Sequence, residues 1–251
     1  MYQEYVKECL TGVDSKQITP DILGPQKSPK PATSPFYDLP SINDLDQYHH
    51  AAQFLKKREI PQRWYSDLRY TANFREFTNL VIPGKFEFVG KSDARIVIPF
   101  FDERGVLVGY QGRALYKTDL RYITIMMDES RAKIWNCDKC DFTKPFFVTE
   151  GPLDGMFLSN AIAMAGADFH LIHGEENAII VYDNEPRNLE MIKKYEKKID
   201  ENFKICIWPD HIEEKDINDM VLAHYKPEEI IRENLYRGLS AKVKLNEWKR
   251  I

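Results

Sequence analysis

Acidic side chains follow three apolar runs in the second half of this 251-residue chain. Glu150 comes directly after "FFVT", and Asp183 and Glu185 end the run "AIIVYDNE". Asp216 and Asp219 lie in "KDIND", a short distance after "FKICIW". Carboxylate oxygens are hard ligands of the kind that Mg²⁺ or Mn²⁺ prefers, and a pair of such ions can stabilise the entering and leaving oxygens of phosphoryl transfer. These residues therefore indicate metal-dependent chemistry on phosphates.

Alternating strand and helix patterns surround the acids from Pro145 onward. Strand patterns occupy "FFVTE", "NAIIVYDNE" and "FKICIWP", and helical patterns occupy "LDGMFLSNAIAMAG" and "PRNLEMIKKYEKKIDEN", with Pro186 suited to a first helical turn. This alternation predicts parallel strands covered by helices. Because chemistry gathers beyond the carboxyl ends of such strands, we expect the three acidic groups to meet at one edge of the sheet.

The pair Asp183 and Glu185 has a spacing with chemical meaning. Residues two apart on an extended strand point the same way, about 6.5 Å apart, so the two side chains are expected to flank one cation or to bridge two. A simpler interpretation is that each acid only stabilises the N-terminus of the following helix. Three acidic groups at three successive strand ends favour the metal site.

The remaining segments define the predicted domains. Residues 1–42 hold six prolines and read as a linker or tail. Residues 43–143 are a mixed subdomain, with a helix in "NDLDQYHHAAQFLKKREI", a helical stretch at 62–68, a hairpin around "DERG" and a strand at "LRYITIM". Residues 144–225 are the catalytic subdomain, and residues 226–251 form a C-terminal helical segment. The predicted fold class is α+β / α/β.

Composition excludes several classes of protein. A hydrophobic content of 43% is enough for a buried core, and there is no apolar run of the length that a membrane span needs. Four scattered cysteines and no secretory signal favour a reducing, intracellular location. Residues 56–133 carry 15 basic and 10 acidic side chains, net +5, between flanks of net −3 and −6. That contrast suits a polyanion bound beside a metal site, although chance clustering of solvated charges is the alternative.

The motifs together resemble a known family. "EGPLD", "YDNEPRN" and "KDIND" after successive strands look like the Toprim domain of primases, topoisomerases and some nucleases. "AAQFLKKREIP", "RIVIPFFDERGVLVGYQGRAL", "RYITI" and "KIWN" are similar, in this order, to the RNA-polymerase domain of bacterial and phage primases, and the wording of the acidic motifs is most similar to the primases of T-even phages. The resemblance covers residues 43 to about 225 and implies a Toprim-like parallel sheet preceded by a mixed primase subdomain.

The resemblance also implies roles for individual residues. Glu150 matches the family's acid/base or metal-facing glutamate, and Asp183 with Glu185 matches its acidic pair. Asp216 and Asn218 match the third cluster, with two departures: Glu185 stands where many members have Asp, and Asn218 stands where others have a second Asp. Asn218 can offer an oxygen but no charge, and Asp219 is a possible substitute. The implied catalytic residues are Glu150, Asp183 and Glu185, and the implied metal ligands are these three with Asp216 and Asn218.

Basic and aromatic residues complete the expected site. Arg113, Arg121, Tyr122 and Arg187 match positions implied to contact nucleotide or template. Guanidinium groups can grip a triphosphate with two donors opposite the metals, and Tyr110 and Tyr122 are available to stack on bases. Gly109 and Gly112 either let nucleic acid approach the backbone or serve a bulge. The lysines of "NLEMIKKYEKKID" are interpreted as a solvated, salt-bridged helix face.

The implied function is that of a DNA primase, which joins ribonucleotides on a single-stranded DNA template with Mg²⁺ or Mn²⁺. Ribonucleoside triphosphates and a replicative helicase are the expected partners, in a bacterial host cytoplasm if the chain is phage-encoded. "CDKC" at 137–140 is half of a zinc site with no second pair at ligand spacing, so no zinc is expected. The alternatives are a Toprim nuclease and a non-catalytic, nucleic-acid-binding recombination mediator, whereas the chain leaves no room for a topoisomerase's strand-passage domain.

Overall fold

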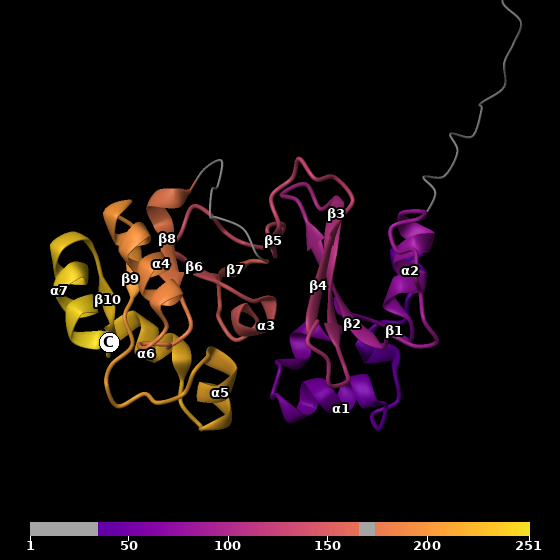
Figure 1. Cartoon of the computed structure of the whole chain (residues 1–251), viewed down its shortest axis with the longest axis horizontal. Coiled ribbons are helices and arrows are strands. Elements are labelled where there is room, and N and C mark those ends of the chain that lie inside the picture. The colour runs from indigo at the N-terminus through magenta and orange to yellow at the C-terminus, as the bar shows by residue number, and fades with distance from the viewer. Residues whose placement is uncertain (1–34, 166–173) are drawn as a thin grey trace, which may run out of the picture. The chain divides into compact units, whose positions relative to one another are not determined.

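Two β-sheets organise the computed structural model, which describes residues 35–165 and 174–251 (Figure 1). The antiparallel sheet has the strand order β1-β2-β3-β4, and the mixed sheet has the order β10-β9-β8-β6-β7-β5. Both belong to one compact unit that begins at Ser34. This architecture confirms the predicted fold class, in which a mixed α+β subdomain precedes a sheet with parallel strands.

The antiparallel sheet contains the predicted hairpin. Its strands are β1 (Arg69–Thr71), β2 (Arg95–Phe101), β3 (Leu107–Ala114) and β4 (Tyr122–Met126). The β2–β3 turn is closed by Asp102, whose Oδ1 accepts hydrogen bonds from the backbone N–H groups of Arg104 and Val106 at 3.0 and 2.9 Å. Gly105 takes φ +74°, a left-handed conformation that glycine adopts without steric cost. These contacts explain why the segment "DERG" forms the predicted turn.

Two helices flank this sheet, and one of them was not predicted. Helix α1 (His50–Lys57) begins later than the pattern from Asn43 suggested, because His49 caps it and a short 3₁₀ turn, η3 (Ile42–Asp44), precedes it. The stretch at 62–68 is reduced to the 3₁₀ turn η4 (Gln62–Trp64). The additional helix is α2 (Phe74–Val81), capped by Asn73.

Tight packing, not access for nucleic acid, accounts for two glycines of β3. A Cβ on Gly112 would lie 2.4 Å from the ring of Phe74 in α2, and one on Gly109 would lie 2.6 Å from the carbonyl oxygen of Ile125. Both positions therefore require the absence of a side chain. Of the two alternatives that the sequence left open, approach of nucleic acid is replaced by this packing constraint, and a bulge fits Gly109, beside which the β2–β3 register shifts between Phe100 and Phe101.

The predicted N-terminal tail is too long at its C-terminal end. Residues 1–34 lie outside the described part of the chain, but the turn η2 (Pro35–Asp38) is structured. Phe36 is buried and packs against Tyr110 and Phe101. The ordered subdomain thus begins before residue 43, because an aromatic side chain among the prolines reaches the core.

The mixed sheet has a parallel centre with antiparallel edges. Strands β6 (Phe146–Thr149), β7 (Ala161–Met164), β8 (Ala178–Val181) and β9 (Lys204–Cys206) run parallel in the order β9-β8-β6-β7. The edge strands β5 (Ile134–Trp135) and β10 (Leu235–Tyr236) pair antiparallel with β7 and β9. The prediction of parallel strands is confirmed for β6, β8 and β9.

One predicted helix is wrong. "LDGMFLSNAIAMAG" contains only the single turn α3 (Pro152–Gly155), and the segment Ala161–Met164 is the buried strand β7. Alanine and methionine favour helix locally, but all four residues of β7 are buried in the sheet. A short, fully apolar run cannot be assigned to helix or strand by periodicity alone, and burial decided it here.

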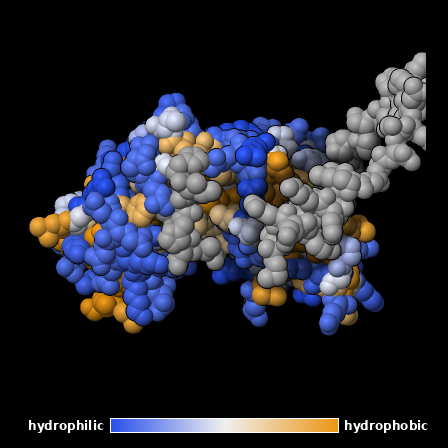
Figure 2. Space-filling view, turned by 90° about the horizontal axis from the view of Figure 1, so that it is seen from above, coloured by the Kyte–Doolittle hydropathy of each residue, from blue (hydrophilic) through white to orange (hydrophobic). Residues whose placement is uncertain are grey.

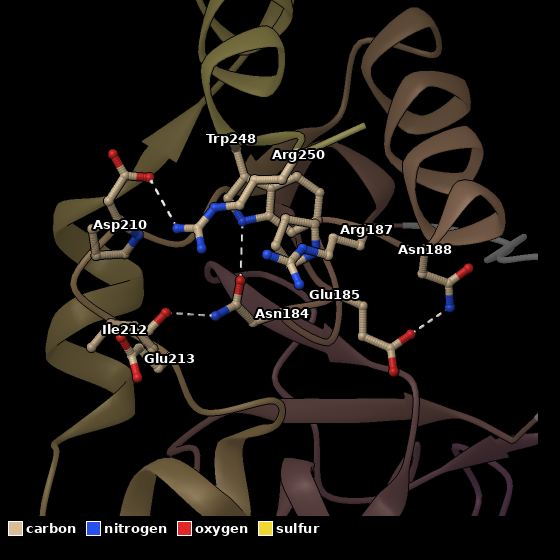
Figure 3. Close-up of a pocket in the computed structure, with 11 residues that line it drawn as sticks. Asn184, Glu185, Arg187, Asn188, Asp210, Ile212, Glu213, Trp248 and Arg250 are labelled. Atoms are coloured by element: carbon tan, nitrogen blue, oxygen red, sulfur yellow. Dashed lines mark hydrogen bonds and ion pairs between the residues drawn. The ribbon is translucent and has the colours of Figure 1, made fainter.

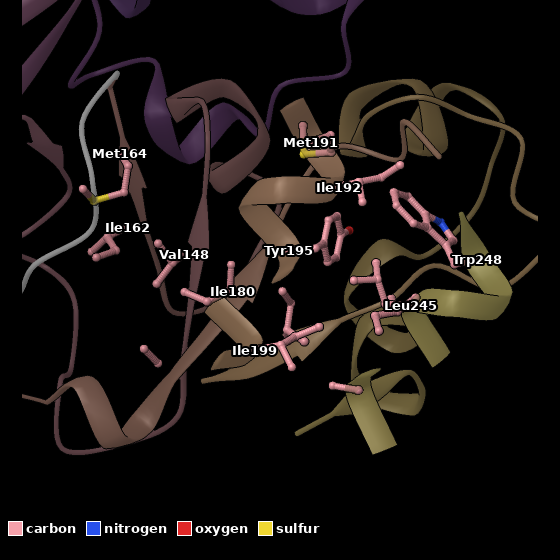
Figure 4. Close-up of a cluster of buried hydrophobic side chains, with 14 of the residues drawn as sticks. Val148, Ile162, Met164, Ile180, Met191, Ile192, Tyr195, Ile199, Leu245 and Trp248 are labelled. Carbon is pink, nitrogen blue, oxygen red and sulfur yellow. The ribbon is translucent and has the colours of Figure 1, made fainter. Parts of the chain in front are cut away.

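The last part of the chain is integrated into the mixed sheet. Helix α4 (Leu189–Asp200) is capped by Asn188, so Pro186 precedes the helix and is not in its first turn as predicted. After α5 (Ile217–Leu222) and α6 (Pro227–Glu233), β10 joins the sheet and α7 (Gly238–Trp248) packs beside α4. Figure 4 shows Leu245 and Trp248 in the core with Ile199 and Tyr195. Residues 226–251 are therefore part of the catalytic unit and contribute a strand as well as helices.

Polar residues dominate the face of the molecule in Figure 2, where hydrophobic atoms form small separate groups. Within the described residues, no helix is both long and apolar enough to cross a membrane.

The packing of α7 gives a stability prediction. Leu245→Ala removes a core side chain that is 3% exposed, so the free energy of unfolding should fall by about 2–5 kcal/mol in urea titrations. Val243→Ala is the matched control on the same helix, because Val243 is 54% exposed and should change stability by less than about 0.5 kcal/mol. Equal effects of the two substitutions would contradict the placement of α7 in the core.

Candidate active site

A cavity of about 620 Å³, here called the inter-sheet cavity, has one wall from each half of the structure. The wall from the first half is basic and polar, and the wall from the mixed sheet is acidic. The first consists of Arg58, Gln111, Arg113, Arg121, Tyr122 and Thr124, and the second of Glu150, Gly151, Leu153, Asp154, Ala165, Asp183, Lys215, Asp216, Asn218 and Asp219. A cavity with opposed cationic and anionic walls can hold a phosphate chain together with its counter-cations.

The acidic wall is assembled at the carboxyl ends of the strands. Glu150 directly follows β6, Asp183 lies two residues beyond β8, and Asp216 caps α5. All three line the inter-sheet cavity, so the predicted convergence of acids from three strand ends is confirmed. Burial, and then the charges of Glu150 and Asp216, raise the pKa of Asp183 to about 7. That shift follows from burying a carboxylate and placing others close to it in one cavity.

Asp154 is an acid that the sequence interpretation did not select. It lies four residues after Glu150, within the turn α3 of the quoted motif "EGPLD". Its side chain retains some solvent contact but is surrounded by protein on nearly all sides, and burial followed by the charges of Asp216 and Asp183 raises its pKa to about 8. The four-residue spacing from Glu150 was the signal that could have identified it.

Two lysines pair with the predicted acids. Lys194 on α4 forms an ion pair with Glu150, and Lys215 forms one with Glu185. The hydrogen bond from Lys215 is the main reason that the pKa of Glu185 is lowered. Lys194 is half-exposed and salt-bridged as expected, although its partner lies outside α4, whereas the expectation of a solvated, salt-bridged face is wrong for Lys198, which is buried and bonded to Glu201 at 2.6 Å. Sequence could not reveal a pair separated by 44 residues.

Glu185 does not face the same cavity as Asp183. Strand β8 ends at Val181, so the two-residue alternation of an extended strand no longer applies at these positions. Glu185 and Arg187 instead line a neighbouring pocket of about 530 Å³, shown in Figure 3, where Asn188 donates to Glu185 at 2.5 Å. Asp183 and Glu185 thus line different pockets, although the charge of Glu185 still acts on Asp183, and Arg187 lines a different pocket from Arg113 and Arg121.

Asn184 connects the two pockets. Its side-chain Nδ2 donates to the carbonyl oxygens of Ile212 and Glu214 at 2.9 and 3.1 Å, and its Oδ1 accepts from the indole Nε1 of Trp248 at 3.0 Å (Figure 3). Its backbone N–H donates to the carbonyl of Lys215 at 2.6 Å. One amide therefore holds the loop before Asp216 against the end of β8 and against α7.

The basic wall centres on Arg113. Its side chain is only 8% exposed, and its guanidinium lies over the rings of Tyr122 and Phe54 at 4.6 and 5.6 Å. The buried Nε has no hydrogen-bond partner within the described residues. Burial is the main cause that lowers the pKa of Arg113, and the nearby charges of Arg58 and Arg121 act in the same direction. A buried cation with a free donor is suited to an anionic ligand.

Of the two tyrosines predicted to stack on bases, one lies in a suitable position and the other does not. Tyr122 is 42% exposed on the cavity wall, so its ring is accessible. Tyr110 is fully buried, with its hydroxyl 3.2 Å from Oγ1 of Thr78, and it cannot stack on a base. Alternation along β3 sends Tyr110 to the side of α2, whereas Gln111 and Arg113 face the cavity.

Asn218 is engaged on both sides of its amide. It is 1% exposed; its Oδ1 accepts from Nη1 of Arg58 at 2.6 Å, and its Nδ2 donates to the carbonyl oxygen of Arg58 at 2.7 Å. Asp219, the possible substitute, lines the inter-sheet cavity, where burial and Asp216 raise its pKa.

The donor chemistry fits Mg²⁺ or Mn²⁺. Glu150, Asp183, Asp216 and Asp219 share one cavity, where burial and then the neighbouring acids raise the pKa values of Asp183 and Asp219; a divalent cation would favour their ionised forms. Across residues 35–165 and 174–251, no three acidic, histidine or cysteine side chains stand close enough to form a ready-made ligand cluster. Lys194, which a metal ion would have to displace, occupies one carboxylate oxygen of Glu150.

Cys137 and Cys140 lie between β5 and β6, half-buried against the core of the mixed sheet. Burial is the main cause that raises the pKa of each thiol to about 12. The absence of zinc from this chain remains a prediction.

Several solved structures with a similar fold are primases. The RNA-polymerase domain of Mycobacterium tuberculosis primase DnaG aligns with a TM-score of 0.56 at 16% identity, over 76% of this chain and 78% of that one. A DnaG primase catalytic domain bound to single-stranded DNA aligns with a TM-score of 0.62 at 16% identity, over 82% and 78%. The Escherichia coli primase catalytic core aligns at 0.56 and 17% identity, over 76% and 75%. The fold is that of a DnaG-type primase catalytic core.

A comparison of sequences shows to which group of primases the chain is related. The DNA primase of Enterobacteria phage T4 is 30% identical over an alignment of 263 residues, which covers 100% of this chain and 75% of that protein. No family model matches the chain. At this identity and coverage, the chain belongs to the family of the phage T4 DNA primase. It is accordingly a DNA primase, an RNA polymerase of phage DNA replication.

The raised pKa of Asp154 gives a pH prediction. Between its ordinary pKa near 3.8 and its folded pKa of about 8, the folded protein retains a proton that the unfolded chain releases. The stability of the metal-free protein should therefore fall as pH rises through this window. Asp154→Asn removes the titrating group, so the variant should be the more stable protein at pH 8, on the order of a few kcal/mol.

Urea unfolding in the presence of a chelator at pH 5, 6, 7 and 8 measures this effect. The advantage of Asp154→Asn should shrink toward pH 5, and Asp128→Asn, at an exposed loop position, should follow the wild-type curve. If the free energy of unfolding varied with pH in the same way for wild type and Asp154→Asn, the predicted rise in the pKa of Asp154 would be contradicted.

Proposed function

We propose that this primase joins ribonucleotides by metal-assisted nucleotidyl transfer in the inter-sheet cavity. A 3′-hydroxyl oxygen attacks the α-phosphate of a ribonucleoside triphosphate, a new phosphorus–oxygen bond forms, and the bond to the β-phosphate breaks with release of pyrophosphate. The observation that carries this proposal is the opposition of Arg113 and Arg121 to Glu150, Asp183 and Asp216 across one cavity. Cations on one wall can hold phosphates while carboxylates on the other hold metal ions.

The acids of the mixed sheet have separate roles in this proposal. Asp183 and Asp216 hold Mg²⁺ or Mn²⁺, with Glu150 and Asp219 within the same cavity. The bound metal would polarise the phosphate and favour the ionised form of the attacking hydroxyl. Glu150, at the end of β6, accepts the proton that this hydroxyl loses. Glu185 acts from the neighbouring pocket, where it keeps Lys215 beside the acidic wall.

The basic wall binds the nucleotide and the template. Arg113 donates from its buried Nε to phosphate, and Arg121 at the exposed edge contacts the backbone of single-stranded DNA. Tyr122 stacks on a base beside these cations. Arg187 lies in the neighbouring pocket with Arg250 and is proposed to contact phosphates that extend beyond the reaction centre. Binding of this kind weakens steeply with salt.

The proposed partners follow from the reaction. Single-stranded DNA is the template, as in the DnaG catalytic domain whose structure contains it, and ribonucleoside triphosphates are the substrates. A replicative helicase would supply the single strand. The place of action would be the bacterial host cytoplasm, where template and triphosphates occur together.

Substitution of the acids tests the proposal directly. Asp183→Ala and Glu150→Gln should each lower primer synthesis on random single-stranded templates by about 100-fold or more, because each removes a group that acts only in the reaction. Labelled ribonucleotide incorporation with Mg²⁺ is the measurement. Asp200→Ala, an exposed acid on the same mixed-sheet half that pairs with Lys242, is the matched control and should retain full activity.

Ordinary activity in Asp183→Ala or Glu150→Gln would overturn the assignment. Release of nucleotides from the template without any need for triphosphates would identify a nuclease instead. Nucleic-acid binding without either activity would point to a recombination mediator.

The Lys194–Glu150 pair gives a second test that does not depend on turnover. Lys194→Gln frees the carboxylate, so Mg²⁺ should bind about two- to fivefold more tightly, while the metal-free protein should unfold at a lower temperature. Mg²⁺-induced shifts in thermal unfolding measure both effects. Lys193→Gln breaks a pair with Glu190 on the same helix and should leave Mg²⁺ affinity unchanged. Weaker Mg²⁺ binding in Lys194→Gln would refute the competition.

A further inference from the structure

Arg58 and Asn218 form a reciprocal pair of hydrogen bonds between the two halves of the structure. The guanidinium Nη1 of Arg58 donates to Oδ1 of Asn218 at 2.6 Å, and Nδ2 of Asn218 donates back to the carbonyl oxygen of Arg58 at 2.7 Å. The two residues are 160 positions apart in the chain. Asn218 is almost fully buried and Arg58 is half-buried, so these bonds lie at the boundary between the core and the cavity.

Each partner is fixed within its own half. Arg58 ends α1, where its backbone N–H donates to the carbonyl oxygens of Phe54 and Leu55, and Glu59 follows in the left-handed conformation with φ +57°. Asn218 belongs to α5, directly beyond the cap residue Asp216, and its backbone N–H donates to Oδ1 of Asp154 at 3.3 Å. The pair therefore joins the end of α1 to the part of the acidic wall that carries Asp216.

The chemistry of the contact requires an amide. Arg58 presents a donor and an acceptor to the same side chain, and a carboxamide has one acceptor and one donor group to match them. A carboxylate in this position would accept from the guanidinium but would lose the donor that the carbonyl oxygen of Arg58 needs. A carbonyl oxygen that loses its partner in this partly buried contact destabilises the folded state. The Asn that stands where the resemblance leads one to expect Asp has, in this chain, a physical reason.

We infer that Asn218 is a positioning residue that clamps α1 to the acidic wall, and not a metal ligand. With Arg58 on one side and Asp216 two residues away, the clamp sets the separation between the cationic and anionic walls of the inter-sheet cavity. Misplacement of reacting groups by about 1 Å can cost roughly 100-fold in rate. The clamp thus acts on the reaction through the distance between the walls. This inference rests on the proposed active site for its kinetic consequence only.

A double-mutant cycle in the metal-free protein tests the clamp itself. Asn218→Ala and Arg58→Met should each lower the urea midpoint, and the double variant should be little worse than either single variant, because each substitution already breaks the same bonds. Asn246→Ala, an exposed position on α7, is the matched control and should combine additively with Arg58→Met. Additive losses for Asn218→Ala and Arg58→Met would overturn the clamp.

Metal binding separates the clamp from a ligand role. Asn218→Ala exchanges one neutral side chain for another, so the Mg²⁺ midpoint from thermal shifts should stay within about twofold of wild type, whereas loss of a ligand should weaken it about tenfold or more. In primer synthesis, kcat should fall roughly tenfold to 100-fold with the KM for template within about threefold. A weakened Mg²⁺ midpoint with unchanged metal-free stability would identify Asn218 as a ligand.

If Asn218→Ala does not fold, Asn218→Ser takes its place in the double-mutant cycle, because serine retains a small polar group at the contact. The same non-additivity with Arg58→Met is expected for it. Inactivity of the wild-type protein in primer synthesis, with the stability coupling intact, would contradict the proposed reaction but leave the clamp standing.

Discussion

The crowding of carboxylates in one cavity is the constraint on which the rest of the site depends. Glu150, Asp154, Asp183 and Asp216 come from three different segments, and burial together with their mutual repulsion raises the pKa values of Asp154 and Asp183. Such an arrangement persists only because the surrounding fold stabilises it. Hydrophobic burial in the core of the mixed sheet supplies that support, since the strands that carry the acids are almost fully buried.

Cations of the chain itself moderate this repulsion. Lys194 pairs with Glu150, Lys215 pairs with Glu185, and Arg58 contributes a favourable charge near Asp154. These groups come from α4, from the loop before α5 and from the end of α1. Partial neutralisation by lysines that are half-exposed is reversible, because an exposed ion pair is worth only about 1 kcal/mol or less. The site can therefore exist without metal and still exchange its lysine contacts for divalent ions.

The two halves of the structure have different tasks in this arrangement. The antiparallel sheet presents arginines through β3 and β4, and the mixed sheet presents acids at the ends of β6 and β8. Asn184 links β8 to the loop before Asp216 and to Trp248 of α7, so the C-terminal helix reaches the site through one amide. Arg58 and Asn218 connect the two halves at the first turn of α5. Two side-chain amides, Asn184 and Asn218, thus help to position a site built from distant segments.

The sequence alone determined the fold class, the parallel strands and the convergence of Glu150, Asp183 and Asp216. The position of an acid after a strand can be read locally, and alternating strands and helices bring the carboxyl ends of parallel strands to one edge of the sheet. Tertiary structure decided what depends on long-range contact. Burial in the sheet made Ala161–Met164 a strand. Because β8 ends at Val181, Glu185 lies in the neighbouring pocket, and the alternation of side chains along β3 buries Tyr110. Lys194 and Arg58 could not be assigned from sequence, because their partners lie 44 and 160 residues away and only packing brings them together.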